Sequence, residues 1–147
     1  MGGHEWFYFV EYEEAINAAL QKLREREFRA GRYNSCHVVP GVPRRAGLAR
    51  AGAQHASIEE AIEEADADGT RSILDMMTVA DEPDFNAVSP LPPEDLMELF
   101  GTDKPTREMI EGNDELFEAL GRGQGVYVVV YKDGRPSEIF FAGYSFD

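Results

Sequence analysis

The chain has 147 residues, of which 43% are hydrophobic and 29% are charged, and its formal net charge at pH 7 is −14. This composition argues against wholesale disorder, and the length suits one domain with a hydrophobic core. The negative charge disfavours nonspecific binding to nucleic acids or anionic membranes, because phosphate contacts need clustered Lys and Arg.

We expect neither a membrane anchor nor a signal peptide in this sequence. No apolar run is long enough for a membrane helix, and the first residues lack the basic-then-apolar pattern of a signal peptide. The single cysteine, Cys36, cannot form an internal disulfide, so a reducing compartment is the simplest interpretation. We therefore expect a cytoplasmic protein that does not bind membranes.

The first half of the chain predicts one strand and two helices. Residues Glu5 to Tyr12 are aromatic or β-branched, and their apolar character on both faces predicts a central strand. An apolar stripe at 3.6-residue spacing then predicts a helix from Glu13 to Phe28, ending near Gly31. Ser57 and Glu60 form a capping box, in which the serine oxygen accepts from the Glu60 amide and a second helix begins.

The second half predicts a strand, two helices and a hairpin. We expect a strand from Arg71 to Val79, a proline-bearing connection from Asp81 to Pro93 and a short helix from Glu94 to Phe100. A last helix from about Thr106 to Leu120 contains Gly112, which should kink or split it.

The C-terminal residues carry the clearest local pattern. Val126 to Tyr131 are β-branched or aromatic, Asp133-Gly134 is a tight-turn dipeptide, and Glu138 to Phe141 form a second apolar run. This pattern predicts a β-hairpin. The whole order of elements predicts a single α+β domain over residues 1–147: a largely antiparallel sheet of about four strands, with helices over one face.

Charge is distributed unevenly along the chain. Between Phe28 and Ile58 there are five arginines and no acidic residue, whereas residues 1–27 sum to −3 and residues 59–147 to −16. Proline and glycine interrupt any periodicity within this basic stretch, so we expect a long Arg/Gly/Pro-rich loop at 32–56. A loop of this length in a compact domain is usually functional or mobile.

The basic stretch 29–55 predicts a candidate anion site. Guanidinium groups bind phosphate or carboxylate bidentately, and glycines let backbone amides approach an anion. The candidate anion-binding residues are Arg32, Tyr33, His37, Arg44, Arg45, Arg50 and His55. The alternative interpretation is that these arginines pair with the acidic residues of the protein itself.

Other motifs favour structural interpretations. Cys36 and His37 are adjacent, so on a strand they point to opposite faces and do not form a nucleophile–base pair. Residues 64–75 have the glycine spacing of a degenerate EF-hand loop, but Glu64 and Asp75 occupy its first and last positions, and we interpret the segment as a helix end and turn. Residues 121–125 precede a strand, unlike dinucleotide-binding glycines. We predict no metal and no cofactor.

Two classes of function follow from these observations. The first is a small acidic interaction protein that binds a basic partner protein, comparable in size and charge with bacterial immunity, antitoxin and inhibitor proteins. The second is a small enzyme or nucleotide-binding domain that holds a phosphorylated ligand with the basic stretch. A general base hydrogen-bonded to a nucleophile would distinguish the second class, and the sequence contains no complete catalytic motif.

Overall fold

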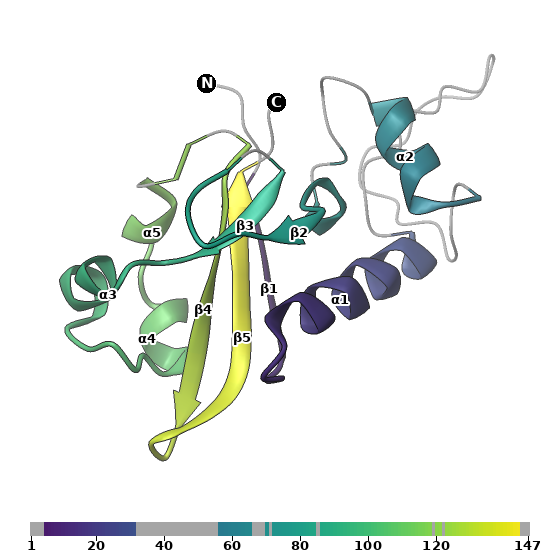
Figure 1. Ribbon diagram of the computed structural model, residues 1–147. Coiled ribbons are helices and arrows are strands. Elements are labelled where there is room, and N and C mark those ends of the chain that lie inside the picture. The colour runs from purple at the N-terminus through teal and green to yellow at the C-terminus, as the bar shows by residue number, and fades with distance from the viewer. Residues whose placement is uncertain are drawn as a thin grey trace.

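The computed structural model describes residues 5–31, 56–65, 70, 72–84, 86–118, 120–121 and 123–144. Five strands in this part of the chain form one sheet in the order β1-β5-β4-β3-β2 (Figure 1). The strands are β1 (Glu5–Glu11), β2 (Thr78–Val79), β3 (Ala87–Pro90), β4 (Gly125–Lys132) and β5 (Arg135–Tyr144). β5 pairs antiparallel with β1 and β4, whereas β3 pairs parallel with β4 and β2. The α+β class is confirmed, but the sheet has five strands and is mixed.

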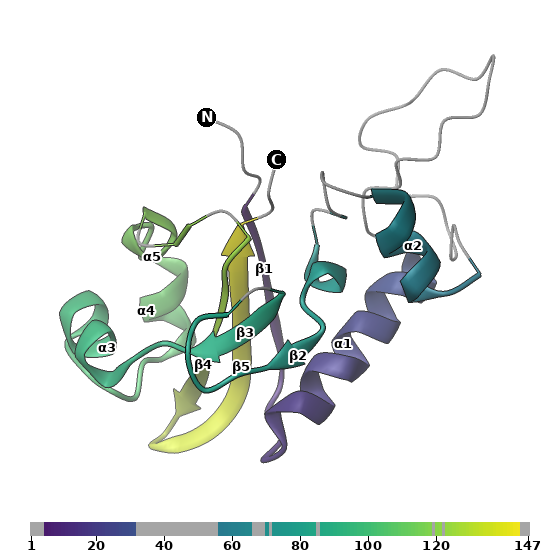
Figure 2. The ribbon, with the colours of Figure 1, turned by 45° about the horizontal axis from the view of Figure 1, so that its top comes forward.

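Helices cover both faces of the sheet. They are α1 (Ile16–Ala30), α2 (Ile58–Ala65), the 3-10 helix η2 (Ile73–Asp75), α3 (Pro93–Phe100), α4 (Arg107–Glu111) and α5 (Glu115–Glu118). In Figures 1 and 2, α1 and α2 lie on one side of the sheet and α3, α4 and α5 on the other. The prediction of helices over one face was therefore wrong.

The two helical layers follow from the pattern of β5, whose buried side chains alternate between two hydrophobic clusters. Ile139 and Phe141 join one cluster with Leu20 and Leu23 of α1. Phe140 and Ala142 join the other, into which α4 and α5 send Ile110 and Leu116. Because a strand points successive side chains to opposite faces, a strand that is apolar throughout needs a cover on each side.

β1 lies at the edge of the sheet, so the prediction of a central position was wrong. Its strand partner is β5, in a register that runs from Glu5 opposite Tyr144 to Glu11 opposite Glu138. That prediction was based on apolar residues on both faces of the strand. In the structure, these residues pack against the two helical layers. Trp6 packs in the cluster of α1, and Phe9 packs in the cluster of α3–α5.

The C-terminal hairpin is confirmed. β4 and β5 pair from Gly125 opposite Gly143 to Lys132 opposite Arg135. The connecting residues Asp133 and Gly134 have φ values of 54° and 77°, which is the backbone geometry of a two-residue type I′ turn. This turn matches the right-handed twist of the strands that it joins, and the register shifts by one residue at an irregularity between Val130 and Tyr131.

Three helix boundaries agree with the sequence. Gly31 ends α1 in the left-handed region with φ 71°, and its amide donates to the carbonyls of Glu27 and Phe28. Ser57 Oγ accepts from the Glu60 amide at 3.2 Å, before α2. Gly112 follows α4 and separates it from α5, as expected for a glycine inside a helical pattern.

The region before β3 was predicted less well. Among its described residues, the predicted strand from Arg71 to Val79 contains the 3-10 helix η2 and only two strand residues, and the predicted connection from Asp81 to Pro93 contains β3. Local hydrogen bonds explain the first error. Asp75 Oδ1 accepts from the amide and the hydroxyl of Thr70, at 2.7 and 2.8 Å, which folds this segment back on itself.

Candidate functional site

The predicted anion site lies outside the described residues. The structure does not describe residues 32–55, and Cys36 is among them. The same range contains all seven candidate anion-binding residues: Arg32, Tyr33, His37, Arg44, Arg45, Arg50 and His55. Arg29 is the one arginine of the basic stretch that is described. It lies in α1, and its Nε donates to Glu25 Oε1 at 2.8 Å. That ion pair is of the kind expected if the arginines of this stretch neutralise the acidic residues of the protein.

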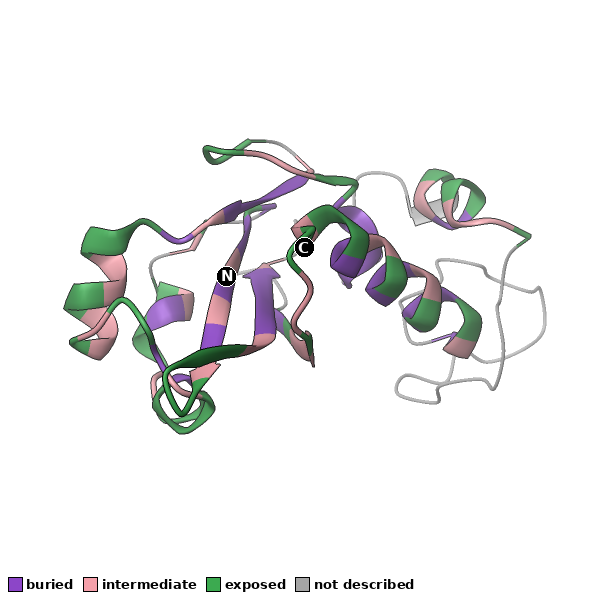
Figure 3. Cartoon of the chain, turned by 60° about the horizontal axis from the view of Figure 1, so that its bottom comes forward, coloured by how far each residue is buried: buried purple, intermediate pink, exposed green. Residues whose placement is uncertain are grey.

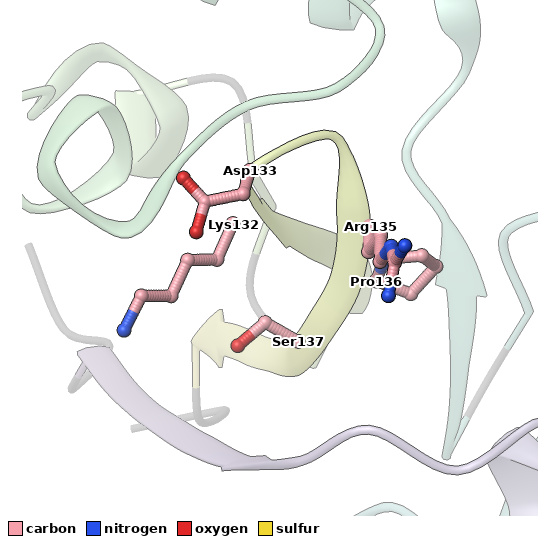
Figure 4. Close-up of a pocket in the computed structure, with 5 residues that line it drawn as sticks. All are labelled: Lys132, Asp133, Arg135, Pro136 and Ser137. Carbon is pink, nitrogen blue, oxygen red and sulfur yellow. The ribbon is translucent and has the colours of Figure 1, made fainter.

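A shallow hollow lies at the turn of the hairpin (Figure 4) and has a volume of about 490 Å³. It is lined by Lys132, Asp133, Arg135, Pro136 and Ser137. Neither Lys132 nor Arg135 forms an ion pair with a described residue. In Figure 4 the charged ends of these two side chains lie on opposite sides of the hairpin strand, so they do not converge on one anion.

A second hollow of about 140 Å³ lies where the end of β3 meets the start of β4. Its lining includes the two carboxylates of Asp84 and Asp95, beside Pro90, Leu91 and Val126. Ligand pockets for drug-sized molecules measure about 300–1,000 Å³, so this hollow is too small for a nucleotide. The negative charges of Asp84 and Asp95 would also repel a phosphate group.

A strongly charged surface is formed by α3, α4 and α5. We name residues 93–118, which contain these three helices, the acidic layer. They include nine acidic and two basic residues, a net charge of −7. The acidic members are Glu94, Asp95, Glu98, Asp103, Glu108, Glu111, Asp114, Glu115 and Glu118. All are exposed except Asp95, which is half-buried, so the layer presents a concentrated negative potential to solvent.

The two cations of the acidic layer are already engaged. Arg107 donates to Glu111 at 2.6 Å and to Glu138 of β5 at 2.9 Å, and its guanidinium lies 4.2 Å from the centre of the Phe9 ring. The hydrogen bond that Arg107 donates to Glu111 is the main cause that raises the pKa of Arg107 above its ordinary value. Lys104 lies over the Tyr131 ring. The other carboxylates of the acidic layer therefore form no ion pair with Arg107 or Lys104.

Two exposed methionines interrupt this negative surface. Met97 in α3 is 53% exposed and Met109 in α4 is 44% exposed. No residue of α3 is fully buried, and Figure 3 shows the helix as exposed and intermediate along its length. Methionine is flexible and polarisable, and it is common on surfaces that bind partner proteins. The acidic layer therefore combines charge with adaptable apolar contacts.

A buried arginine on the other side of the sheet has a structural role. Arg24 of α1 is 8% exposed and donates to Gln21 Oε1 at 2.9 Å and to the Leu74 carbonyl at 3.2 Å. Burial lowers the pKa of Arg24 below its ordinary value, against the opposing charges of Glu59 and Asp75. Arg24 therefore ties α1 to η2, and it is not accessible to a ligand.

The described part of the chain contains neither a cluster of metal-ligating side chains nor a membrane-spanning helix. No three His, Cys, Asp or Glu side chains there gather closely enough to hold a metal ion. Asp75, the last position of the EF-hand-like segment, instead accepts the hydrogen bonds of Thr70. None of the described helices combines the length and the apolar character needed to cross a bilayer.

The sequence located the acidity to residues 59–147 but not to the three helices of the acidic layer. The acidic residues of the layer occur at helix-surface spacing from position 94 onward, and a count of charge by element would have located them. Comparisons of the chain with protein-family models, with curated proteins and with solved structures find no match. The charge and geometry of the described surface are therefore the basis for a functional proposal.

Proposed function

We propose that this chain is an interaction protein that binds a basic partner protein, in the manner of small immunity, antitoxin and inhibitor proteins. The observation that carries the proposal is the acidic layer. It contains nine acidic residues and only two basic ones, and Arg107 and Lys104 already contact other residues of the protein. Complementary charge raises the rate of association and selects against acidic partners.

The exposed apolar groups support the same proposal. Charge alone gives steering, whereas a stable interface also needs side chains that become buried at its centre. Met97 and Met109 supply such side chains within the acidic layer. The alternative function, a small enzyme or nucleotide-binding domain, depends on the basic stretch 29–55 and stays a prediction from the sequence.

Capture of partners followed by kinetics tests the proposal. The immobilised protein is exposed to a lysate at low salt, each retained protein is identified, and its association rate is then measured with purified components against ionic strength. We expect a partner with a basic surface, whose association slows steeply as salt rises, because charges are screened over about 10 Å at 0.1 M. Retention of acidic partners only, or a rate independent of salt, would contradict the proposal.

A matched pair of variants assigns the effect to the acidic layer. Glu98→Gln with Glu118→Gln removes two exposed charges from the layer, and Glu60→Gln with Glu63→Gln removes two exposed charges from α2. Both variants have the same net charge. We expect the first to slow association several-fold more than the second. Equal slowing would show that only the total charge matters.

A further inference from the structure

The outer edge of β1 has the features of a docking site for an extended peptide segment. β1 is seven residues long, it lies at the end of the strand order, and no described strand pairs with its outer side. Phe7, near its middle, is 57% exposed. Long apolar edge strands readily pair with another strand, and natural proteins usually protect them.

The hydrogen-bond pattern identifies which backbone groups face outward. Tyr12 donates its amide to the Ser137 carbonyl at 3.2 Å, and this pair continues the register of β1 with β5. On the other side of β5, Tyr144 exchanges hydrogen bonds with Gln124 and Gly123 of the neighbouring segment. Residues of an antiparallel pair point their amides alternately toward and away from the partner strand. Trp6, Tyr8 and Val10 therefore bond β5.

The same alternation directs the backbone of the odd-numbered residues away from β5. These residues are Glu5, Phe7, Phe9 and Glu11. Their side chains all lie on the face of the sheet that carries the acidic layer. Phe7 contacts Phe117 of α5, with ring centres 6.1 Å apart, and Phe9 packs in the α3–α5 cluster. A strand added to β1 would thus meet outward amides and carbonyls and two aromatic rings.

The negative charges at the two ends of β1 indicate which peptide segments its outer edge can bind. Glu5 and Glu11 are exposed, and neither forms an ion pair with a described residue. Glu11 lies opposite Glu138, but Arg107 binds Glu138. Full antiparallel pairing with a second copy would place Glu5 opposite Glu11 of that copy, and like charges directly opposite are destabilising. A segment with a cation at each end fits instead.

We propose that the outer edge of β1 binds an extended basic segment of the partner protein as a sixth, antiparallel strand. Cationic side chains would lie opposite Glu5 and Glu11, and apolar side chains would lie opposite Phe7 and Phe9. Main-chain hydrogen bonds supply affinity in such strand addition, and the alternate side chains supply specificity. This inference rests on the proposed function, because it adds the β1 edge to the acidic layer as a second surface that the same basic partner contacts.

A heptapeptide of sequence Lys-Thr-Val-Thr-Val-Thr-Lys is the direct probe. In antiparallel register its lysines fall opposite Glu11 and Glu5, and its valines fall opposite Phe9 and Phe7. We expect millimolar peptide to protect the amides of Phe7, Phe9 and Glu11 from hydrogen exchange, measured by NMR on the full chain. The amides of Tyr8 and Val10, which bond β5, should be protected with and without peptide. Unchanged exchange of the outward amides would overturn the proposal.

Charge exchange tests specificity. Glu5→Lys with Glu11→Lys should weaken binding of the lysine peptide at least tenfold and should create binding of the peptide with glutamate at both ends. If the variant binds both peptides as wild type does, the proposal fails. Protection of the outward amides without peptide, together with a dimer in sedimentation, would identify a second copy as the occupant and would also overturn it.

Two substitutions at one position separate the backbone from the side chain. Phe7→Pro removes an outward N–H that β5 does not use, whereas Phe7→Ala keeps that N–H and removes the ring; proline is tolerated on edge strands in this orientation. We expect the proline variant to lose most peptide binding and the alanine variant to lose less, with an unchanged NMR spectrum at β4 in both. Equal binding by both variants and wild type would contradict strand addition.

The partner protein distinguishes the failure of this inference from the failure of the proposed function. If capture yields a basic partner whose binding is insensitive to Phe7→Pro and to Glu5→Lys with Glu11→Lys, the interaction function holds and the β1 site is wrong. If capture yields no basic partner, the proposed function itself fails.

Discussion

At position 143 the sheet has room for a hydrogen atom but not for a methyl group. A Cβ added to Gly143 would lie 2.5 Å from Trp6 Cζ2 and 2.5 Å from the Gln124 carbonyl oxygen. Gly125, its partner on β4, would place a Cβ 3.3 Å from the same indole. This pair of glycines therefore lets the Trp6 ring lie close to the backbone, and Trp6 is 5% exposed as a result.

We expect Gly143→Ala to destabilise the protein by about 1–3 kcal/mol, which is the usual cost of overpacking a core. Urea denaturation measures the change. In a Trp6→Phe background the cost of Gly143→Ala should be smaller, because the ring atoms that it meets are gone and neighbouring substitutions are not additive. An equal cost in both backgrounds would show that the indole does not limit the space.

Tyr127 gives a residue-scale prediction for pH. Burial, followed by the nearby charge of Asp81, raises the pKa of the Tyr127 phenol above its ordinary value. The neutral phenol is thus favoured in the folded state. Its contribution to stability is complete below about pH 10, the ordinary tyrosine pKa, and is lost as the pH rises through the folded-state pKa. Tyr127→Phe lacks this ionisation. Unfolding free energies above pH 9 should therefore fall more steeply for wild type, and superimposed curves would contradict the assignment.

At the scale of single elements, α3 carries charge at both ends. Glu94 lies in its first turn, where a negative charge is favourable to the helix dipole, and Glu98 lies toward its last turn, where it is not. The two residues are also like charges one helical turn apart. Part of the acidic layer therefore stabilises its helices, and part of it, Glu98 included, does not.

Two variants with the same net charge test this difference. Glu98→Lys should stabilise the protein by about 0.3–1 kcal/mol, and Glu94→Lys should be less stable than Glu98→Lys by at least that amount, because the lysine then opposes the dipole. Thermal unfolding of the two variants side by side measures the difference. If both variants have the same stability, only the net charge matters in α3.

The elements that the sequence predicted well are those whose signals are local. The hairpin at Asp133-Gly134, the end of α1 at Gly31 and the break at Gly112 each depend on the backbone preferences of one or two residues. The edge position of β1 was missed because two-sided burial in this sheet comes from separate helical layers, which sequence periodicity does not reveal. β3 was missed because it is only four residues long and ends in Pro90.

The candidate surface was predicted only in composition. Net charge follows from a count of residues, but the gathering of nine acidic residues in one layer depends on α3, α4 and α5 packing against the same face of the sheet. The outward amides of β1 depend on its register with β5, which joins residues from opposite ends of the chain. Such long-range pairing cannot be deduced from the local pattern of Glu5–Glu11.

For the whole molecule, the net charge of −14 predicts how salt affects stability. Excess charge of one sign destabilises the compact state by self-repulsion, and salt screens that repulsion. We expect the melting temperature to rise when sodium chloride is increased from about 0.02 M to about 0.5 M, a range over which the Debye length falls steeply. The exposed ion pairs, such as Arg29–Glu25, weaken under the same conditions but contribute little. A fall in melting temperature would show that attractive pairs outweigh the net repulsion.

The pairing of β1 with β5 also constrains the order in which the chain can fold during synthesis. β1 is the first described strand to leave the ribosome, and its strand partner β5 is the last. Until β5 emerges, Trp6 has no sheet to pack on and both edges of an aromatic strand are open, which is the kind of segment that aggregates in incomplete chains. Contacts between such distant segments also slow folding. We expect Glu5 and Glu11, at the two ends of β1, to reduce such aggregation before the sheet is complete, because like charges on nascent chains repel each other.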